Sequence, residues 1–301
     1  MRTIDAPFAS AKARSSPSSG AQRAPLPDGR WHFHHGPIDL VIGADGDPQS
    51  VSQAVEAAWR RFEIILPELV GELRLLRSPV QQAQDVKGSV ARRMIAACWP
   101  HRSCFITPMA AVAGAVADEL IECFGAQAGV RRAYVNDGGD IALHLAAGES
   151  FQVGLFADLG RIARRKPLHL DGRFEVTAAL PVRGVATSGW RGRSLSLGIA
   201  DSVTVLAGTA AQADAAATMI ANAVYVGDDS IVRRPASSLK DDTDLGDRLV
   251  TVEVGTLSPG RVACALEAGA GHARGLLERG VIWAAWLWLQ GQTRSVGGGR
   301  T

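Results

Sequence analysis

The chain has 301 residues, of which 47% are hydrophobic and 21% are charged. This composition is typical of a folded protein with one or two domains and excludes a wholly disordered chain. The 32 Lys and Arg residues nearly balance the 30 Asp and Glu residues, and the formal net charge is +2. The charge balance therefore indicates neither a nucleic-acid partner nor a membrane-surface partner.

The cysteines and the apolar segments favour a cytoplasmic protein. The cysteines form no CxxC pair and have no metal-site spacing with histidine, and they fit small core residues in a reducing compartment: Cys98, Cys104, Cys123 and Cys264. The N-terminal segment has bases but lacks the apolar region of a secretory signal. No run of about 18 apolar residues occurs, so we expect no membrane span.

The chain divides into three parts. Residues 1–29 are rich in Ser, Pro, Ala and Arg without periodicity and predict a disordered tail. Residues 30–296 are expected to form a single domain, and residues 297–301 a frayed end. Two short strands are expected around His35-Gly36-Pro37.

A long helix is expected next, because apolar residues keep helical spacing from Val51 to Leu73. Ser50 or Ser52 is a suitable N-cap. Pro67 is expected to kink this helix or to divide it in two.

The segment 77–106 gives no clear pattern. Thr107 and Pro108 then resemble an N-cap followed by proline at the first helical position, before an alanine-rich helix. Short strands are expected in the middle of the chain at 134–136, 141–145, 151–156, 174–180 and 202–206.

In the last third, Thr209 and Gln212 form a capping box at the start of a helix over 210–224. A strand over 249–254, a helix over 260–279 and a strand over 281–290 complete the pattern. Because helices and antiparallel-looking strands alternate irregularly, the fold class expected is α+β, with mixed, mostly antiparallel sheets packed with helices.

The first segment that could carry chemistry is the acidic glycine turn from Asn136 to Asp140. Adjacent Gly138 and Gly139 allow positive φ and let another group approach the backbone closely. The alternative is a tight hairpin turn with solvated aspartates, because Asp-Gly is a leading hairpin signal.

The second segment is Gly184–Gly189. Its small hydroxyl residues between glycines could present backbone N–H groups to an anion such as phosphate. Arg191 and Arg193 follow, and the guanidinium fork suits phosphate oxygens. The alternative is an ordinary Gly/Ser loop.

The third segment is helical. Asp214, Thr218 and Asn222 are spaced four residues apart and share one helix face. A carboxylate with neutral oxygen ligands suits Mg²⁺, which takes its other ligands from waters or substrate phosphates. The alternative is a polar stripe that faces water.

Other candidate sites are weaker. His32 and His34 share one strand face, and His35 lies on the other. The acidic loop 241–247 lacks the closing Glu of an EF-hand and fits a solvated loop better. The sequence has no GxSxG, GxGxxG or GxxxxGK[ST] motif.

Together the segments resemble the ApbE superfamily of flavin transferases, and most closely its uncharacterised ApbE-like branch. The resemblance rests on NDGGDIAL, GVATSG and SVTVLAGTAAQADAAAT in that order, and on ITPMAAVAGAVAD at residues 106–118. It covers the chain from about Trp31 to Val296.

The resemblance implies an ApbE-like fold with a flavin-nucleotide cleft that uses Mg²⁺ and FAD. The transferases attach FMN to a Thr hydroxyl of an acceptor protein and release AMP. Their metal motif matches Asp214 and Thr218 here. The implied cofactor-binding residues come from the two glycine segments: Asn136, Gly138, Gly139, Asp140, Thr187, Ser188 and Gly189.

The chain departs from the transferases at two motifs. Their lysine-glycine pair falls where Ala113 precedes Gly114, and the segment Trp190–Asp201 contains none of their histidines. Catalytic residues therefore stay unassigned. The leading hypothesis is a Mg²⁺-assisted flavin site that supports FMN transfer from FAD. The alternatives are a non-catalytic binding or assembly protein, and a hydrolase of a small phosphorylated metabolite.

Overall fold

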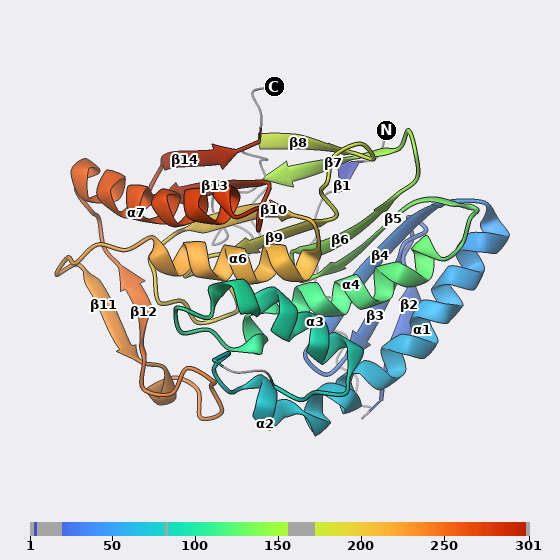
Figure 1. Cartoon of the computed structure of the whole chain (residues 1–301), viewed down its shortest axis with the longest axis horizontal. Coiled ribbons are helices and arrows are strands. Elements are labelled where there is room, and N and C mark those ends of the chain that lie inside the picture. Colours follow the sequence, from blue (N-terminus) through green and yellow to red (C-terminus); the bar gives the residue numbers. More distant parts are fainter. Residues whose placement is uncertain (1–2, 5–19, 82–83, 156–171, 299–301) are drawn as a thin grey trace.

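The computed structural model describes residues 3–4, 20–81, 84–155 and 172–298. Its centre is a nine-stranded sheet in the order β14-β13-β10-β9-β6-β5-β4-β3-β2, in which neighbouring strands are antiparallel (Figure 1). The strands are β2 (Gln22–Pro25), β3 (Trp31–His35), β4 (Ile38–Gly46), β5 (Val130–Asp137), β6 (Asp140–Leu145), β9 (Gly184–Ser188), β10 (Ser202–Ala207), β13 (Ala284–Leu289) and β14 (Gln292–Gly297).

Two small sheets accompany the large one. The first joins β1 (Thr3–Ile4), β7 (Ser150–Leu155) and β8 (Gly172–Thr177), with a parallel β1–β7 pair and an antiparallel β7–β8 pair. The second is the antiparallel ribbon of β11 (Ile231–Pro235) and β12 (Leu249–Val254).

Helices cover one face of the large sheet (Figure 1). The α-helices are α1 (Pro48–Gly71), α2 (Leu73–Leu76), α3 (Ser89–Cys98), α4 (Val112–Gly125), α6 (Ala210–Ala223) and α7 (Pro259–Glu278). Short 3₁₀ turns are η1 (Trp99–His101), η2 (Pro108–Ala111) and η3 (Ala236–Ser238). No helix in the described ranges has the length and apolarity needed to cross a membrane. The α+β class with mostly antiparallel sheets is confirmed.

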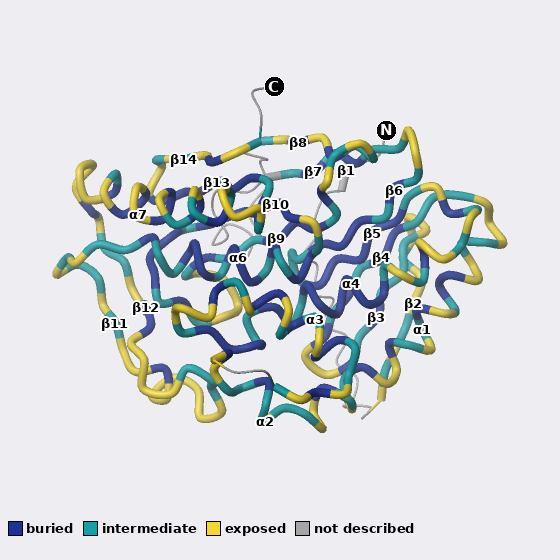
Figure 2. The backbone as a smooth tube through the Cα atoms, viewed as in Figure 1, coloured by how far each residue is buried: buried dark blue, intermediate teal, exposed yellow. Residues whose placement is uncertain are grey.

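The core lies on both faces of the large sheet because side chains alternate along each strand. On the helix face, Leu40, Val135 and Ala142 pack in one cluster with the first turns of α6. On the opposite face, Tyr134 and Val185 pack with β7 and β8. Figure 2 shows the buried chain concentrated where α4 and α6 lie on the sheet.

The start of the chain differs from the expectation of a disordered tail up to residue 29. Gln22–Pro25 form the edge strand β2, which pairs with β3. An edge strand needs only backbone hydrogen bonds on one side, so a polar, proline-containing segment can form it. The expected tail over residues 5–19 lies outside the described residues, as does the expected frayed end over 299–301.

The first long helix begins and ends differently from expectation. Its N-cap is Asp47, whose carboxylate accepts a hydrogen bond from the Ser50 backbone N–H at 2.8 Å. Pro48 occupies the first helical position, where a missing N–H costs nothing. Pro67 lies inside one continuous α1 and does not divide it.

One other local expectation was wrong, and a second holds in part. The Gly184–Gly189 segment is not an ordinary loop, because Gly184–Ser188 form the interior strand β9 between β6 and β10. Thr107 is the N-cap residue before Pro108 as expected, but its side chain makes no cap hydrogen bond, and Pro108 opens a 3₁₀ turn rather than α4 itself. By contrast, the Thr209 hydroxyl accepts from the Gln212 N–H, so this expected cap of α6 is confirmed.

Glycine at the crossing of α4 and α6 generates a prediction. A Cβ at Gly114 would lie 2.4 Å from the Ala210 carbonyl oxygen, whereas a Cβ at Gly275 on α7 would meet nothing within 4 Å. We expect Gly114→Ala to lower the unfolding free energy by roughly 1–3 kcal/mol. The control Gly275→Ala should raise it by up to about 1 kcal/mol. Urea unfolding measures both, and equal effects of the two substitutions would contradict the tight crossing.

Candidate functional site

Three aspartates gather on the helix face of the sheet. Asp137 ends β5 and Asp140 begins β6, and the two are directly paired across the hairpin, so their side chains share one face. On the other side of β5, the pairing with β4 aligns Asp137 with Leu40 of the helix-face core. Asp214 reaches this place from α6. We call Asp137, Asp140 and Asp214 the carboxylate cluster.

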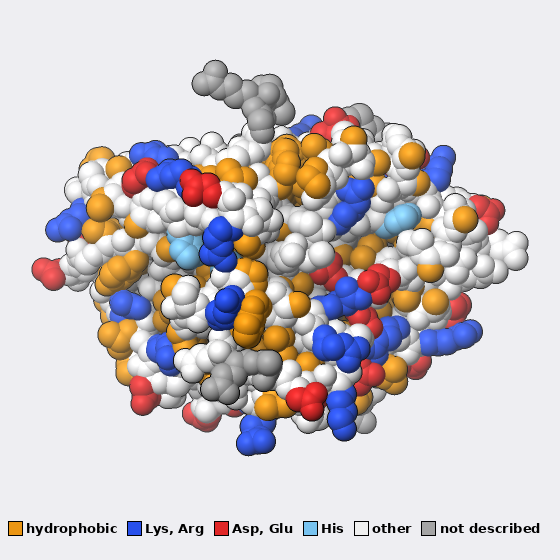
Figure 3. All heavy atoms as spheres, in the orientation of Figure 1, with side chains coloured by type: hydrophobic (Ala, Val, Ile, Leu, Met, Phe, Trp, Pro, Cys, Tyr) orange, Lys and Arg blue, Asp and Glu red, His pale blue; other side chains and the backbone are white. Residues whose placement is uncertain are grey.

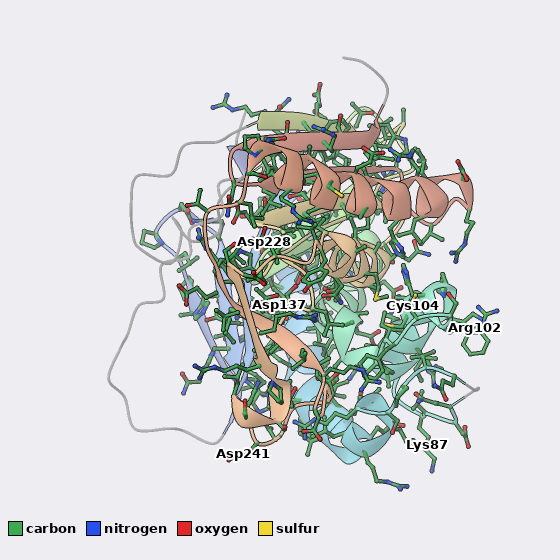
Figure 4. The ribbon with its side chains drawn as sticks, turned by 90° about the vertical axis from the view of Figure 1, so that its left-hand side faces the viewer. Lys87, Arg102, Cys104, Asp137, Asp228 and Asp241 are labelled. Carbon is green, nitrogen blue, oxygen red and sulfur yellow. The ribbon has the colours of Figure 1, made fainter. Side chains whose placement is uncertain are left out.

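The hairpin turn that brings two of these acids together needs its glycines. Gly138 and Gly139 have φ of +64° and +118°, which side chains rarely adopt. The Asn136 side-chain oxygen accepts from the Gly139 N–H at 2.8 Å and closes the turn. The segment therefore forms the tight hairpin turn given above as the alternative. Its Asp137 is not solvated, however, because the residue is only 4% exposed. Figure 4 shows Asp137 in the interior, in contrast to Asp241 at the periphery.

Each carboxylate of the cluster receives little compensation from hydrogen bonds. Asp214 accepts one from the Gly114 N–H of α4 at 3.1 Å. Asp140 accepts one from the Thr187 N–H of β9 at 3.3 Å. Asp140 and Asp214 keep a partly exposed edge although protein surrounds both. They are therefore not fully sealed in the core.

Burial raises the pKa of every member of the cluster, and repulsion between carboxylates raises it further for Asp137 and Asp214. Burial is the largest cause and repulsion from Asp140 the second for Asp137, whose pKa rises to about 8. Burial raises the pKa of Asp140 to about 7, opposed by the Thr187 N–H and by Arg193. The pKa of Asp214 also lies well above its ordinary value, because of burial and then the Asp140 charge. Such a cluster favours either protons or an added cation.

Thr218 lies one turn beyond Asp214 on α6 and is also partly exposed, while Ala215 and Ala217 beside it are buried. A carboxylate and a hydroxyl one turn apart provide two hard oxygen donors that fit Mg²⁺. The described residues contain no group of three or more His, Cys, Asp or Glu side chains that could hold a metal. A cation here would therefore complete its shell with backbone, water or phosphate oxygens.

The predicted cofactor-binding residues do not share one side of the sheet. Thr187 pairs with Thr204 across β9–β10, and their hydroxyls lie 2.9 Å apart on the face opposite α6. Asn136 pairs with Ile141 and shares that opposite face. Ser188 pairs with Val203 of the helix-face core, so its side chain lies on the side of the carboxylate cluster.

Two further residues of the predicted segments have structural contacts. A Cβ at Gly189 would lie 2.5 Å from the Asp201 carbonyl oxygen, so glycine permits this close approach. The Asn222 side-chain oxygen accepts from the Leu197 N–H at 2.9 Å and from the Ser196 hydroxyl at 3.3 Å. Asn222 therefore anchors the β9–β10 loop, although it follows Asp214 and Thr218 at helical spacing.

Sequence analysis did not select three residues that shape the site. Asp137 was a flank of the turn, Gly114 belonged to a small-residue helix face, and Asp118 ended the matched segment 106–118 without a role assigned to it. The Asp118 carboxylate accepts from the Ala210 and Ala211 N–H groups at 2.9 and 2.8 Å. It thereby joins α4 to the first turn of α6, where N–H groups lack intrahelical partners.

The weaker candidates have ordinary structural partners. His32 contacts Asp39 at 2.6 Å and stacks beside His34. In the acidic loop 241–247, Asp242 pairs with Arg77 at 2.9 Å, and Asp241 is exposed. On the face in Figure 3, acidic and basic side chains are interspersed.

The sequence of this α+β chain matches a known protein family and its relatives. The chain belongs to the AbpE bacteria family, whose family model matches residues 23–295. This membership confirms the resemblance to the ApbE-like superfamily. A UPF0280 protein of Methanosarcina acetivorans is 31% identical over 218 residues, covering 71% of this chain and 79% of the relative. One from Methanopyrus kandleri is 37% identical over 208 residues, covering 68% and 78%.

Solved structures show a more distant likeness. The apo flavinyl transferase ApbE of Pseudomonas stutzeri is 14% identical, with a TM-score of 0.44 and coverage of 92% of this chain and 94% of that one. The flavin transferase ApbE of Vibrio cholerae is 11% identical, with a TM-score of 0.44 and coverage of 93% and 98%. Likeness of this degree establishes neither the activity nor the ligands of this chain.

The raised pKa values predict how stability depends on pH. Between about pH 4 and pH 8 the folded chain keeps protons on Asp137 and Asp140 that the unfolded chain releases, so stability falls as pH rises. We expect Asp137→Asn to flatten this fall and to raise the melting temperature at pH 8 by roughly 2–4 °C or more. Thermal melts from pH 5 to 9 in EDTA measure it. Asp241→Asn should keep the wild-type slope, and an unchanged slope in Asp137→Asn would contradict the account.

The Asp118 contact predicts a second effect on stability. Asp118→Ala leaves two buried N–H groups of α6 without their partner, so we expect a loss of roughly 1–3 kcal/mol. Asp241→Ala, in an exposed loop, should stay within about 0.5 kcal/mol of wild type. Chemical unfolding compares the two, and a loss below about 0.5 kcal/mol at Asp118 would refute its role in holding α6.

Proposed function

We propose that this protein binds a flavin nucleotide together with Mg²⁺ at the carboxylate cluster, and that the reaction the site supports is FMN transfer from FAD to a protein hydroxyl. One observation carries the proposal. Asp214 and Thr218 present two oxygen donors beside Asp137 and Asp140, two carboxyl groups whose burial raises their pKa values. A divalent cation relieves that repulsion, and family membership makes a flavin nucleotide the proposed ligand.

Each predicted residue has a part in this proposal. Asp214 and Thr218 would hold Mg²⁺, which supplies charge neutralisation on the phosphate oxygens. Asp140 lies beside this pair, and the Gly138-Gly139 turn precedes it in the chain. Ser188 and Gly189 lie at the end of β9 on the same side, while Asn136 and Thr187 support the strands from behind.

A second candidate function is flavin or nucleotide binding without transfer, as a binding or assembly protein. Two observations favour it. Ala113 rather than lysine precedes Gly114, whose N–H binds Asp214. In the described part of the chain, His32 contacts Asp39 and His144 contacts the Val130 carbonyl, and neither partner belongs to the cluster. These histidine contacts therefore supply no general base for an acceptor hydroxyl at the cluster.

The cysteines bear on the compartment of this protein. The four cysteines are free, and two of them, Cys104 and Cys264, are exposed. We propose a reducing cytoplasm for this chain, where exposed thiols persist. We propose that the transfer substrate is an acceptor protein with a reachable hydroxyl.

Incubation with FAD and Mg²⁺ tests the proposed function. We expect AMP release and covalent FMN on an acceptor protein, detected by chromatography and in-gel flavin fluorescence. Asp214→Asn and Thr218→Val should each reduce Mg²⁺-dependent flavin binding by roughly 10-fold or more, because each removes a metal ligand. Asp241→Asn is the matched control and should bind as wild type does.

The same experiment separates the two candidate functions. Flavin binding that requires Mg²⁺ and Asp214 but yields no AMP favours the binding protein. Release of phosphate or of a mononucleotide from small pyrophosphates, without FMN transfer, indicates the hydrolase. Absence of flavin binding with and without Mg²⁺ refutes both flavin proposals.

A further inference from the structure

Arg193 lies at the outer edge of the carboxylate cluster. Its Nη2 is 3.9 Å from Asp137 Oδ1, and the Arg193 side chain is 61% exposed whereas that of Asp137 is 6% exposed. A Cβ at Gly138 would lie 1.7 Å from Nη2, so the guanidinium lies directly on the backbone of the glycine turn. One end of the pair is thus buried acid, and the other end is an accessible cation.

The loop that carries Arg193 is fixed at both ends. The Trp190 N–H donates to the Ala200 carbonyl at 3.0 Å and closes the loop at its base. Further along, the Leu197 N–H donates to the Asn222 side-chain oxygen of α6. The loop is therefore tied to the helix that carries Asp214 and Thr218, which sets the position of Arg193 relative to that pair.

The guanidinium keeps unused donors at this position. At 3.9 Å its contact with Asp137 is an ion pair rather than a hydrogen bond. Its charge also acts on Asp140, whose pKa it lowers. Arginine has five N–H donors in a planar fork that matches phosphate oxygens. A cationic fork beside acidic side chains suits a phosphate that is bound to Mg²⁺, because the cation offsets the repulsion between the phosphate and the acids.

Resting on the proposed function, we propose that Arg193 binds the phosphate oxygens of the ligand and selects phosphorylated flavins over uncharged flavins. Asp137 acts as a positioning residue that holds the guanidinium over the Gly138 turn. The site then divides its work. Asp214 and Thr218 hold the metal, and Arg193 contacts the phosphate next to the Gly138 turn. The ligand class is a flavin phosphate or diphosphate, and riboflavin, which has no phosphate, binds weakly.

Arg191 provides the matched control. It lies two residues from Arg193 in the same loop and carries the same charge, but its guanidinium lies over the Trp190 ring at 4.7 Å. Changing either arginine removes one positive charge from the loop. Only the change at Arg193 removes the cation next to the cluster.

The test compares ligands that differ by one phosphate. Binding of FMN and of riboflavin is measured by flavin fluorescence with saturating Mg²⁺, and Mn²⁺ binding alone is measured by electron paramagnetic resonance. We expect Arg193→Gln to weaken FMN binding by roughly 10-fold or more, about 1.4 kcal/mol, and to leave the weak riboflavin binding unchanged. Arg193→Lys should recover part of the FMN affinity, and Arg191→Gln should match wild type. Mn²⁺ binding should persist in all three variants.

The outcomes distinguish the role of Arg193 from the proposed binding of flavin and Mg²⁺. If wild type binds FMN and Arg193→Gln binds it equally well, the role of Arg193 is overturned while the flavin site stands. If FMN and riboflavin lose affinity together, Arg193 shapes the loop and does not read phosphate. If wild type binds neither FMN nor Mn²⁺, the proposed function fails, and the inference fails with it.

Discussion

The close approach of α6 to the sheet and to α4 determines the rest of this structure. α6 brings an almost uniformly small face to this junction, and Gly114 and Gly184 remove the side chains that would hold the backbones apart. A Cβ at Gly184 would lie 2.0 Å from the Thr209 carbonyl carbon. Because the elements touch through their backbones, Asp214 reaches the acids of the β5–β6 hairpin. Like charges are thereby gathered in a region of low polarity, which is unstable without a compensating proton or cation.

Local patterns in the sequence predicted much of the architecture. Residues 249–254 form β12 with the expected bounds, and the capping pattern at Thr209 placed the start of α6 correctly. The interior strand β9 was missed because glycines at both ends of GVATSG are typical of loops. Gly184 does not form a turn, because it allows the backbone of β9 to pack closely against the backbone of Thr209. Asp47 was missed as an N-cap because its turn cluster masked the Asp-Pro pair that begins α1.

The candidate site was only partly predictable, since its geometry comes from contacts distant in sequence. Helical spacing grouped Asp214, Thr218 and Asn222, but the third residue anchors a loop, and no periodicity distinguishes these roles. Strand alternation puts Thr187 on the face away from Asp140, and this depends on β9 being a strand. The partners of Asp118 lie more than 90 positions away. No local pattern relates such residues.

Thr187 makes contacts on both faces of the sheet. Its backbone N–H holds Asp140 on one side, while its hydroxyl contacts Thr204 on the other. A displacement of β9 that originates behind the sheet therefore moves the amide that orients this carboxylate, even though no side chain passes through. The hydrophobic cluster between the large sheet and β7–β8 is therefore coupled to the carboxylate cluster through the residue Thr187.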